Sequence, residues 1–198
     1  DSPQGQVEGS SSVGNTNFTC GGESMKDKTL PVVEVFDSIQ GEGVHMGKPA
    51  TFIRLSGCNL HCPWCDTDHS RFKRFTVDEL VKRAHCSMVV ITGGEPGIHD
   101  LWNLVRALHD SGHYVAVETN GTYSIGKLYR PWIDWVTCSP KPETNYLIVD
   151  GCMPNELKYV VDEKFHPRVI PAQYYHYLPI WLQPEGFHMQ ESAKRAFQ

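Results

Sequence analysis

The sequence predicts an α/β fold built around a mostly parallel β-sheet with few helices, and three observations carry this prediction. Strand-like segments alternate with stretches of helical spacing along most of the chain. Several strands, such as residues 88–92, are apolar throughout, as parallel strands covered on both faces are. Polar or glycine-rich motifs follow five strands directly, which is typical of ligand-binding sheet edges.

Each element follows from a local pattern. Thr76 and Glu79 have the spacing of a capping box, so a helix is predicted to follow Thr76, with apolar residues at helical spacing up to Ala84. A second helix is predicted around residues 101–108, with Gly112 just beyond its end. The chain finishes in a further helical pattern. Strands are predicted at 32–36, 51–55, 88–92, 114–118, 132–138, 157–161 and 180–182.

The composition is that of an ordinary globular domain. Of the 198 residues 40% are hydrophobic and 21% are charged, and the net charge of −5 gives no basic surface for a nucleic acid. No apolar run has the length of a membrane-spanning helix, and no secretory signal begins the sequence. We therefore expect no nucleic-acid or membrane partner and a cytoplasmic protein.

The first 24 residues differ from the rest. They contain five Gly and five Ser and no Lys or Arg, and few of them are apolar. We predict a disordered tail or an expression remnant at 1–24, with Met25 as a candidate natural start, and a single domain over 25–198.

Three of the seven cysteines lie within eight residues, in the segment CNLHCPWC (58–65). Clustered thiols in a chain without a signal peptide indicate a metal site rather than disulfides. Thiolates suit iron–sulfur clusters, and three of them on a four-iron cluster leave one iron open to a small molecule. A Cys₃His zinc site with His61 or His69 remains an alternative, although no second cysteine pair is present to complete a zinc module.

The spacing CxxxCxxC resembles the signature of the radical S-adenosylmethionine (SAM) superfamily, and Thr92-Gly93-Gly94-Glu95-Pro96 resembles its GGEP motif. The resemblance implies an incomplete TIM-like barrel of the radical SAM type. It also implies that Cys58, Cys62 and Cys65 hold a 4Fe–4S cluster that cleaves SAM. Trp64 would lie near the adenine. The implied cofactor-binding residues are Trp64, Asp66, Gly94, Glu95, Glu118, Ser139, Lys141 and Gln183.

The segments around the cysteines narrow the resemblance. Ser38-Ile39-Gln40-Gly41-Glu42-Gly43, Arg54 and Cys65-Asp66-Thr67 resemble the 7-carboxy-7-deazaguanine synthase family, and the likeness runs from about residue 32 to residue 183. That family converts 6-carboxy-5,6,7,8-tetrahydropterin to 7-carboxy-7-deazaguanine with loss of ammonia, in 7-deazapurine (queuosine-type) biosynthesis. The implied substrate-binding residues are Ile39, Gln40, Gly41, Glu42, Arg54 and Thr92.

The chemistry of these side chains agrees with a pterin carboxylate. Gln40 and Glu42 suit an amide-like edge and an exocyclic amine, and Arg54 suits a carboxylate. Thr67 is an oxygen ligand for Mg²⁺. Taken alone, Arg54 is equally an ion-pair partner and Thr67 a turn hydroxyl. The resemblance further implies a homodimer and an external one-electron reductant of flavodoxin or ferredoxin type.

Two alternatives stay open on the sequence alone. A glycyl-radical activating enzyme uses the same cysteine spacing, but SIQGEG and Asp66-Thr67 are not expected there. The other alternative is a non-catalytic zinc-binding module. One departure from the family is the absence, before Gln198, of the terminal Gln-x-His-Lys-like segment that usually closes its pocket. A second is the short insert between Asp68 and Thr76, which predicts a compact region after the cysteines.

Overall fold

The computed structural model describes residues 28–186 and 189–196, so the expectation for residues 1–24 lies outside the described part. Its strands are β1 (Thr29–Ile39), β2 (Pro49–Leu55), β3 (Lys73–Thr76), β4 (Met88–Gly93), β5 (Tyr114–Thr119), β6 (Trp135–Cys138), β7 (Glu156–Val161) and β8 (Ile180–Pro184). Its α-helices are α1 (Val77–Arg83), α2 (Trp102–Asp110), α3 (Ile125–Tyr129) and α4 (Met189–Ala196).

All eight strands form one sheet in the order β3-β1-β2-β4-β5-β6-β7-β8. The six neighbouring strands β2, β4, β5, β6, β7 and β8 pair in parallel. The remaining strand pairs are antiparallel: β1 with β2 and β1 with β3. The two ends of this order, β3 and β8, do not pair with each other, so the barrel stays open. The expected α/β fold with an incomplete barrel is therefore confirmed.

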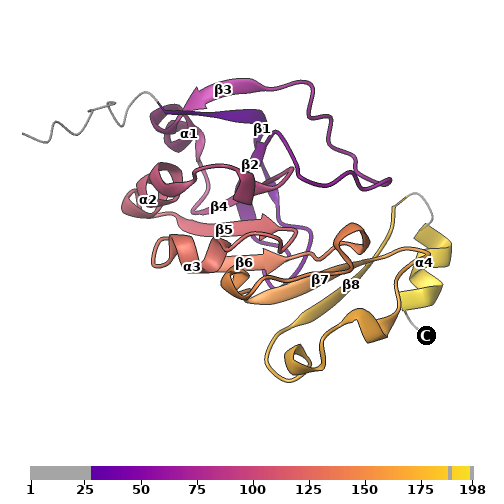
Figure 1. The fold of residues 1–198 in the computed structure, drawn as a ribbon. Coiled ribbons are helices and arrows are strands. Elements are labelled where there is room, and N and C mark those ends of the chain that lie inside the picture. The colour runs from indigo at the N-terminus through magenta and orange to yellow at the C-terminus, as the bar shows by residue number, and fades with distance from the viewer. Residues whose placement is uncertain (1–27, 187–188, 197–198) are drawn as a thin grey trace, which may run out of the picture.

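The sheet is covered on both faces, which explains its apolar strands. On one face Ile53, Ile91 and Val117 are fully buried beneath α1, α2 and α3, which lie along the same side of the sheet (Figure 1). On the other face Phe52, Val90 and their neighbours form a smaller apolar cluster. Alternation along each strand thus sends one set of side chains to the helices and the other into the open barrel.

Local signals set the two helix boundaries that the sequence predicted, the start of α1 and the end of α2. The hydroxyl of Thr76 accepts from the amide of Glu79 and the Glu79 carboxylate accepts from the amide of Thr76, which completes the capping box of α1. Gly112 follows α2 with a φ of +85°, the left-handed conformation that glycine adopts freely.

Other boundaries differ from the sequence predictions. β3, an edge strand of four residues with exposed Lys73 and Arg74, was not predicted because it is too short and too polar for a strand pattern. The five-residue α3 was missed for lack of length. β1 continues to Ile39. β6 begins only at Trp135, because Trp132 lies in a turn and donates its amide to Tyr129 O at 2.9 Å.

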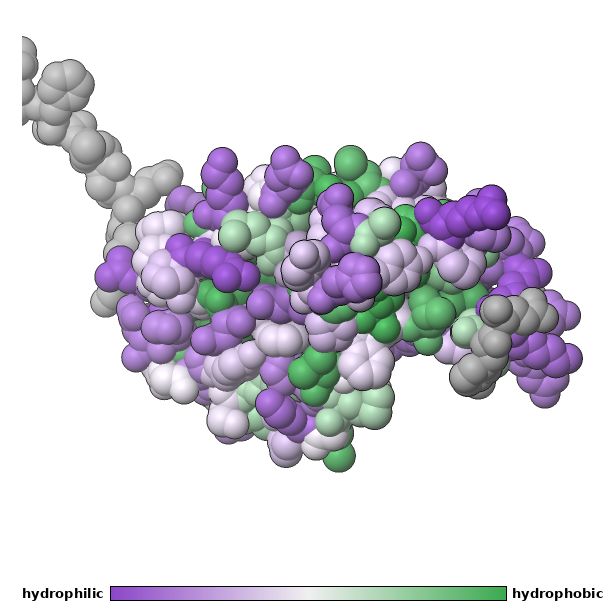
Figure 2. All heavy atoms as spheres, turned by 90° about the horizontal axis from the view of Figure 1, so that it is seen from below, coloured by the Kyte–Doolittle hydropathy of each residue, from purple (hydrophilic) through white to green (hydrophobic). Residues whose placement is uncertain are grey.

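The surface seen in Figure 2 mixes the two kinds of side chain, with apolar patches separated by hydrophilic residues. Within the described part of the chain, no helix has the length and apolar character needed to cross a membrane.

Candidate active site

The five motifs that follow strands meet at one cavity of about 700 Å³ at the carboxyl edge of the sheet. Because parallel strands end on the same side, loops distant in sequence are brought together there. Each predicted motif contributes to the lining, as Cys58, Gly94, Asn120, Ser139 and Gln183 illustrate.

Cys58, Cys62 and Cys65 all line this cavity as free thiols. The loop turns so that the Cys65 amide donates to Cys62 O at 3.1 Å, and the Leu60 amide points at Cys58 Sγ at 3.4 Å. Burial raises the pKa of Cys58. Burial, together with the Glu143 carboxylate near its sulfur, raises the pKa of Cys62 to about 12. A metal bound here must therefore displace protons from these thiols.

This donor set fits an iron–sulfur cluster. Three soft ligands lie on one loop beside a cavity large enough for a small molecule, which matches a cluster with one open iron. Among residues 28–186 and 189–196, no group of three His, Cys, Asp or Glu side chains converges on a single metal ion.

The paired glycines of GGEP join the end of β4 to the cysteine loop. Gly94 donates its amide to Leu55 O at 3.0 Å, and Glu95 donates to Gly57 O at 2.9 Å. A Cβ at Gly93 would overlap the backbone of Leu55, and one at Gly94 would overlap Gly57 O. The sequence pattern suggested close approach to a ligand, but the contacts that require glycine here are with the backbone just before Cys58.

Glu95 is fully buried and connects two loops of the cavity edge. Its Oε1 accepts from Thr119 Oγ1 at 2.7 Å and from the Gly97 amide at 2.8 Å, and its Oε2 accepts from the Asn120 amide at 2.6 Å. Burial raises the pKa of this carboxyl. The side chain predicted to contact the cofactor is thus committed to holding the loops after β4 and β5 together.

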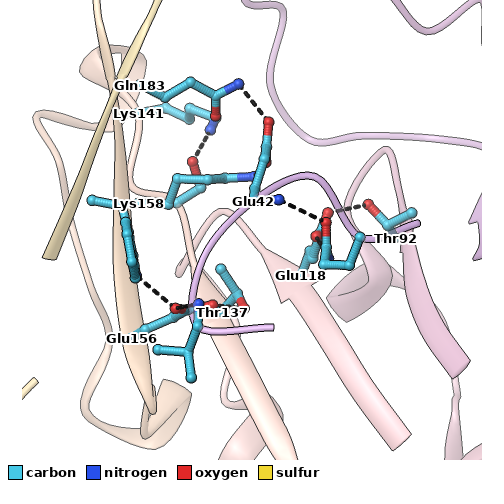
Figure 3. A network of polar contacts seen from close by, with 12 residues as sticks. Glu42, Thr92, Glu118, Thr137, Lys141, Glu156, Lys158 and Gln183 are labelled. Atoms are coloured by element: carbon cyan, nitrogen blue, oxygen red, sulfur yellow. Dashed lines mark hydrogen bonds and ion pairs between the residues drawn. The ribbon is translucent and has the colours of Figure 1, made fainter. Parts of the chain in front are cut away.

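A second group of polar side chains lines the same cavity and joins predicted substrate residues to Glu118 and Gln183, which the resemblance assigned to the cofactor. Glu118 accepts from Gln40 Nε2 at 3.1 Å and from Thr92 Oγ1 at 2.8 Å. Glu42 accepts from both Lys158 and Gln183, so the loop after β1 is tied to β7 and β8 (Figure 3). Predicted residues from four separate segments therefore form one network.

Lys158 is the residue of this network that sequence reasoning missed. It lines the cavity and forms an ion pair with Glu42, with its side chain 12% exposed. Burial favours a higher pKa for Glu118, but Lys158, Thr92 and Gln40 more than offset it and hold that pKa below its ordinary value. The missed signal was the alternation in β7: Leu157 and Tyr159 are fully buried, so Lys158 between them must face the interior of the barrel.

Around the cysteines, Trp64 donates its indole N–H to Asp162 Oδ2 at 3.3 Å. Lys141 Nζ lies 5.3 Å from the centre of the Trp64 ring and donates to Ser139 Oγ at 2.5 Å. Burial, with Lys158 nearby, lowers the pKa of Lys141 to about 8. These predicted cofactor residues therefore lie together beside the cysteine loop.

Three predicted residues have weaker links to the cavity. Arg54 lines it but is paired through Nε with Glu34 Oε1 at 2.8 Å. Thr67 lines it and donates to Asp66 Oδ1 at 3.3 Å. Ile39 is not among the lining residues, and 64% of it is exposed.

Comparison with known proteins places this geometry in a family. Residues 52–139 match the family model described as the radical SAM superfamily. The chain is 36% identical over 187 residues to a 7-carboxy-7-deazaguanine synthase of Aquifex aeolicus, a match that covers 87% of this chain and 84% of that relative. The chain belongs to the 7-carboxy-7-deazaguanine synthase family.

Other members of the family agree with this assignment. The chain is 49% identical over 111 residues to the enzyme of that name from Bacteroides thetaiotaomicron, a match covering 54% of this chain and 59% of the relative. For the Synechocystis sp. member the identity is 42% over 146 residues, 69% of this chain and 68% of the relative. The chain thus spans between about three fifths and five sixths of these relatives.

A solved structure of the family has the same fold. The crystal structure of QueE from Escherichia coli matches with a TM-score of 0.68 and 29% sequence identity, and the match covers 84% of this chain and 87% of that one. The family is one of radical SAM enzymes, which implies a 4Fe–4S cluster and SAM, and the zinc-binding alternative is thereby set aside.

Proposed function

We propose that this protein is a radical SAM carbon–nitrogen lyase that converts 6-carboxy-5,6,7,8-tetrahydropterin to 7-carboxy-7-deazaguanine and ammonia. The observation that carries the proposal is the shared cavity: the three thiols and the Gln40–Glu118–Glu42 network line the same space. The names of the relatives support the same reaction.

In this proposal Cys58, Cys62 and Cys65 would hold the cluster, which when bound would supply the electron for reductive cleavage of SAM to a 5′-deoxyadenosyl radical. The chain's own task there is to hold SAM. The residues proposed to contact it near the cysteine loop are Trp64, Asp66, Gly94, Ser139 and Lys141, with Gln183 at the adenosyl end.

The Gln40–Glu118–Glu42 network would orient the pterin. The carboxylates of Glu42 and Glu118 suit the N–H groups of the pterin edge, and Gln40 and Thr92 fix the position of Glu118. Because Gln183 bonds to Glu42, the proposed cofactor end and substrate end of the cavity are linked through one contact. Removal of the C6 hydrogen then depends on how these residues align the ring with the radical.

Charged groups complete the proposed substrate site. Arg54 would bind the pterin carboxylate, for which it has donors besides the Nε that bonds Glu34. Thr67 and that carboxylate would supply oxygen ligands to Mg²⁺, with water completing its coordination. We further propose a homodimer, a flavodoxin- or ferredoxin-like reductant and the reducing cytoplasm, which suits free thiols.

An anaerobic assay tests this function. The reconstituted and reduced protein is incubated with SAM, Mg²⁺ and 6-carboxy-5,6,7,8-tetrahydropterin, and the deazaguanine product is measured by mass spectrometry. We expect one ammonia per product and no net consumption of SAM. If no product forms while the cluster is intact and SAM is bound, the substrate assignment is wrong although the superfamily assignment stands.

A further inference from the structure

A buried carboxylate outside the cavity, on β7, accepts hydrogen bonds from the loop after β1 and from two other strands of the sheet, β6 and β8. Glu156, at the start of β7, is 2% exposed and does not line the cavity. Its Oε1 accepts from Trp135 Nε1 at 3.1 Å and from Thr137 Oγ1 at 2.7 Å. Its Oε2 accepts from Trp181 Nε1 at 2.7 Å and from the amide of Val44 at 2.8 Å.

The Val44 amide belongs to the segment 40–48, which we call the substrate loop because it carries Gln40 and Glu42. The ends of this loop are tied to each other by backbone hydrogen bonds. The backbone N–H of Gln40 donates to Lys48 O at 2.8 Å, and the backbone N–H of Gly47 donates to Gln40 O at 2.8 Å. Such a closed loop keeps its own shape, so its contacts with the sheet decide where it lies.

Besides the bonds of Gln40 and Glu42 described above, two contacts hold the substrate loop to the barrel. One is the bond from Val44 to Glu156. The other is His45, which is 5% exposed and packs its ring against Tyr114 and Trp135, with ring centres 5.2 Å and 4.7 Å away. Trp135 takes part in both, because its indole N–H also donates to Glu156.

The loop is shaped to fit this carboxylate. Gly43 has a φ of +69°, and a Cβ there would overlap the carboxylate of Glu156. Only glycine lets the backbone approach so closely. Two residues further along β7, on the same face of the strand, Lys158 holds the carboxylate of Glu42 (Figure 3). β7 therefore contacts the loop on both sides of Gly43.

We propose that Glu156 is a positioning residue for substrate: it fixes the substrate loop so that Gln40 and Glu42 face the pterin, without touching the pterin itself. This inference rests on the proposed function for its kinetic readout. It assigns a role in substrate affinity to a residue beneath the site, while SAM binding, at the cysteine loop, should depend on it much less, only through the contact of Gln183 with Glu42.

Glu156→Gln is the sharpest variant because it keeps the size of the side chain. A glutamine amide has one acceptor oxygen and one donor nitrogen. Whichever way it turns, its NH₂ group faces an N–H donor: Trp135 on one side, or Val44 and Trp181 on the other. Gly43→Ala disturbs the same contact from the loop side and decides the question if Glu156→Gln does not fold.

The test combines two readouts on the reconstituted holoenzyme. Hydrogen exchange of peptides covering 40–48, without pterin, should be faster in Glu156→Gln and Gly43→Ala than in wild type. The KM for 6-carboxy-5,6,7,8-tetrahydropterin should rise roughly tenfold or more, since the Val44 amide then either loses its acceptor or bonds to a neutral oxygen in place of a carboxylate. The KM for SAM, and the 5′-deoxyadenosine released without pterin, should stay within about twofold.

Thr137→Val is the matched control. It removes another donor to Glu156, from β6, and leaves the bond to Val44 in place, so loop exchange and both KM values should match wild type. Wild-type loop exchange in a folded Glu156→Gln or Gly43→Ala variant would overturn the inference. An equal rise in both KM values would overturn it too, by showing general damage. If wild type itself does not convert the pterin, the proposed function fails while the exchange measurement still decides the position of the loop.

Discussion

The buried carboxylate of Glu95 accepts a hydrogen bond from the backbone amide of Asn120, with 2.6 Å between N and Oε2. This bond joins the loop after β4 to the loop after β5. The same carboxylate also holds Thr119 and Gly97. The carboxyl edge of the sheet is therefore cross-linked by a carboxyl group that solvent does not reach.

Glu95→Gln should destabilise the protein without removing any atom that lines the cavity. Both oxygens of Glu95 accept an N–H or O–H, so the new NH₂ group must face a donor. We expect a loss of roughly 1–3 kcal/mol in the free energy of unfolding, as for other unsatisfied buried polar groups. Chemical denaturation of the cluster-free protein measures this loss. Glu163→Gln, at an exposed position, is the control and should leave the free energy of unfolding unchanged.

Cys62→Ala should abolish cluster assembly. Two thiolates hold a four-iron cluster poorly, so the variant should lack the brown colour and the bound iron and sulfide of the reconstituted wild type. Cys86→Ala is the matched control, because Cys86 is also a free, partly buried thiol but does not line the cavity. Normal iron content in Cys62→Ala would contradict the assignment of the ligands.

The sequence predicted the parts of this site that stand at strand ends. Cysteine spacing and GGEP are local signals, and parallel strands bring them to one edge whatever their separation in the chain. The segment 38–43 is also a local signal, but it follows the antiparallel β1 and reaches the cavity from the opposite end of the strands. Glu156 and Lys158 were not predicted as site residues, because a charged residue inside a strand looks like a solvent-facing one. Their inward direction follows only from the curvature of the barrel and from the buried Leu157 and Tyr159 that flank Lys158.

Glu95 was predicted to contact the cofactor, whereas its carboxylate bonds to the loops after β4 and β5. GGEP marks the place of its backbone, but the direction of the carboxylate depends on where the loop after β5 lies. Likewise β3 exists because Lys73–Thr76 finds the edge of β1, a long-range pairing with almost no local signal. Local chemistry was thus readable from the sequence, and the partners of buried charges were not.

Lys141 should titrate near pH 8 in the cluster-free protein. Burial lowers its pKa from 10.5 to about 8, so between these values the folded protein has lost a proton that the unfolded chain still binds. The stability linked to Lys141 is therefore present above pH 10.5 and is lost as the pH falls through 8. Lys141→Met should accordingly stabilise the cluster-free protein at pH 7, by up to about 3 kcal/mol, and the gain should shrink above pH 8.

Trp64 offers a direct optical test of that titration. The Lys141 ammonium lies 5.3 Å from its ring centre, so loss of the charge should change the indole emission. We expect a transition in tryptophan fluorescence with a midpoint near pH 8 that is absent from both Lys141→Met and Trp64→Phe. A transition that survives in Lys141→Met would assign it to another group.

Lys158→Met should weaken binding of the pterin much more than binding of SAM. Lys158 is the cation that Glu42 contacts and that lowers the pKa of Glu118, and without it two carboxylates would face each other across the cavity without a shared counter-charge. The pKa of Glu118 should rise, and Glu42 should lose its tie to β7. We expect the KM for the pterin to rise by about tenfold or more, since Glu42 and the buried Glu118 lose the cation that both carboxylates face. Lys164→Met removes a charge from an exposed position after β7 and is the control. An unchanged KM in Lys158→Met would mean that Glu42 and Glu118 orient the substrate without this lysine, and Gln183 would then be the contact that holds Glu42 in place.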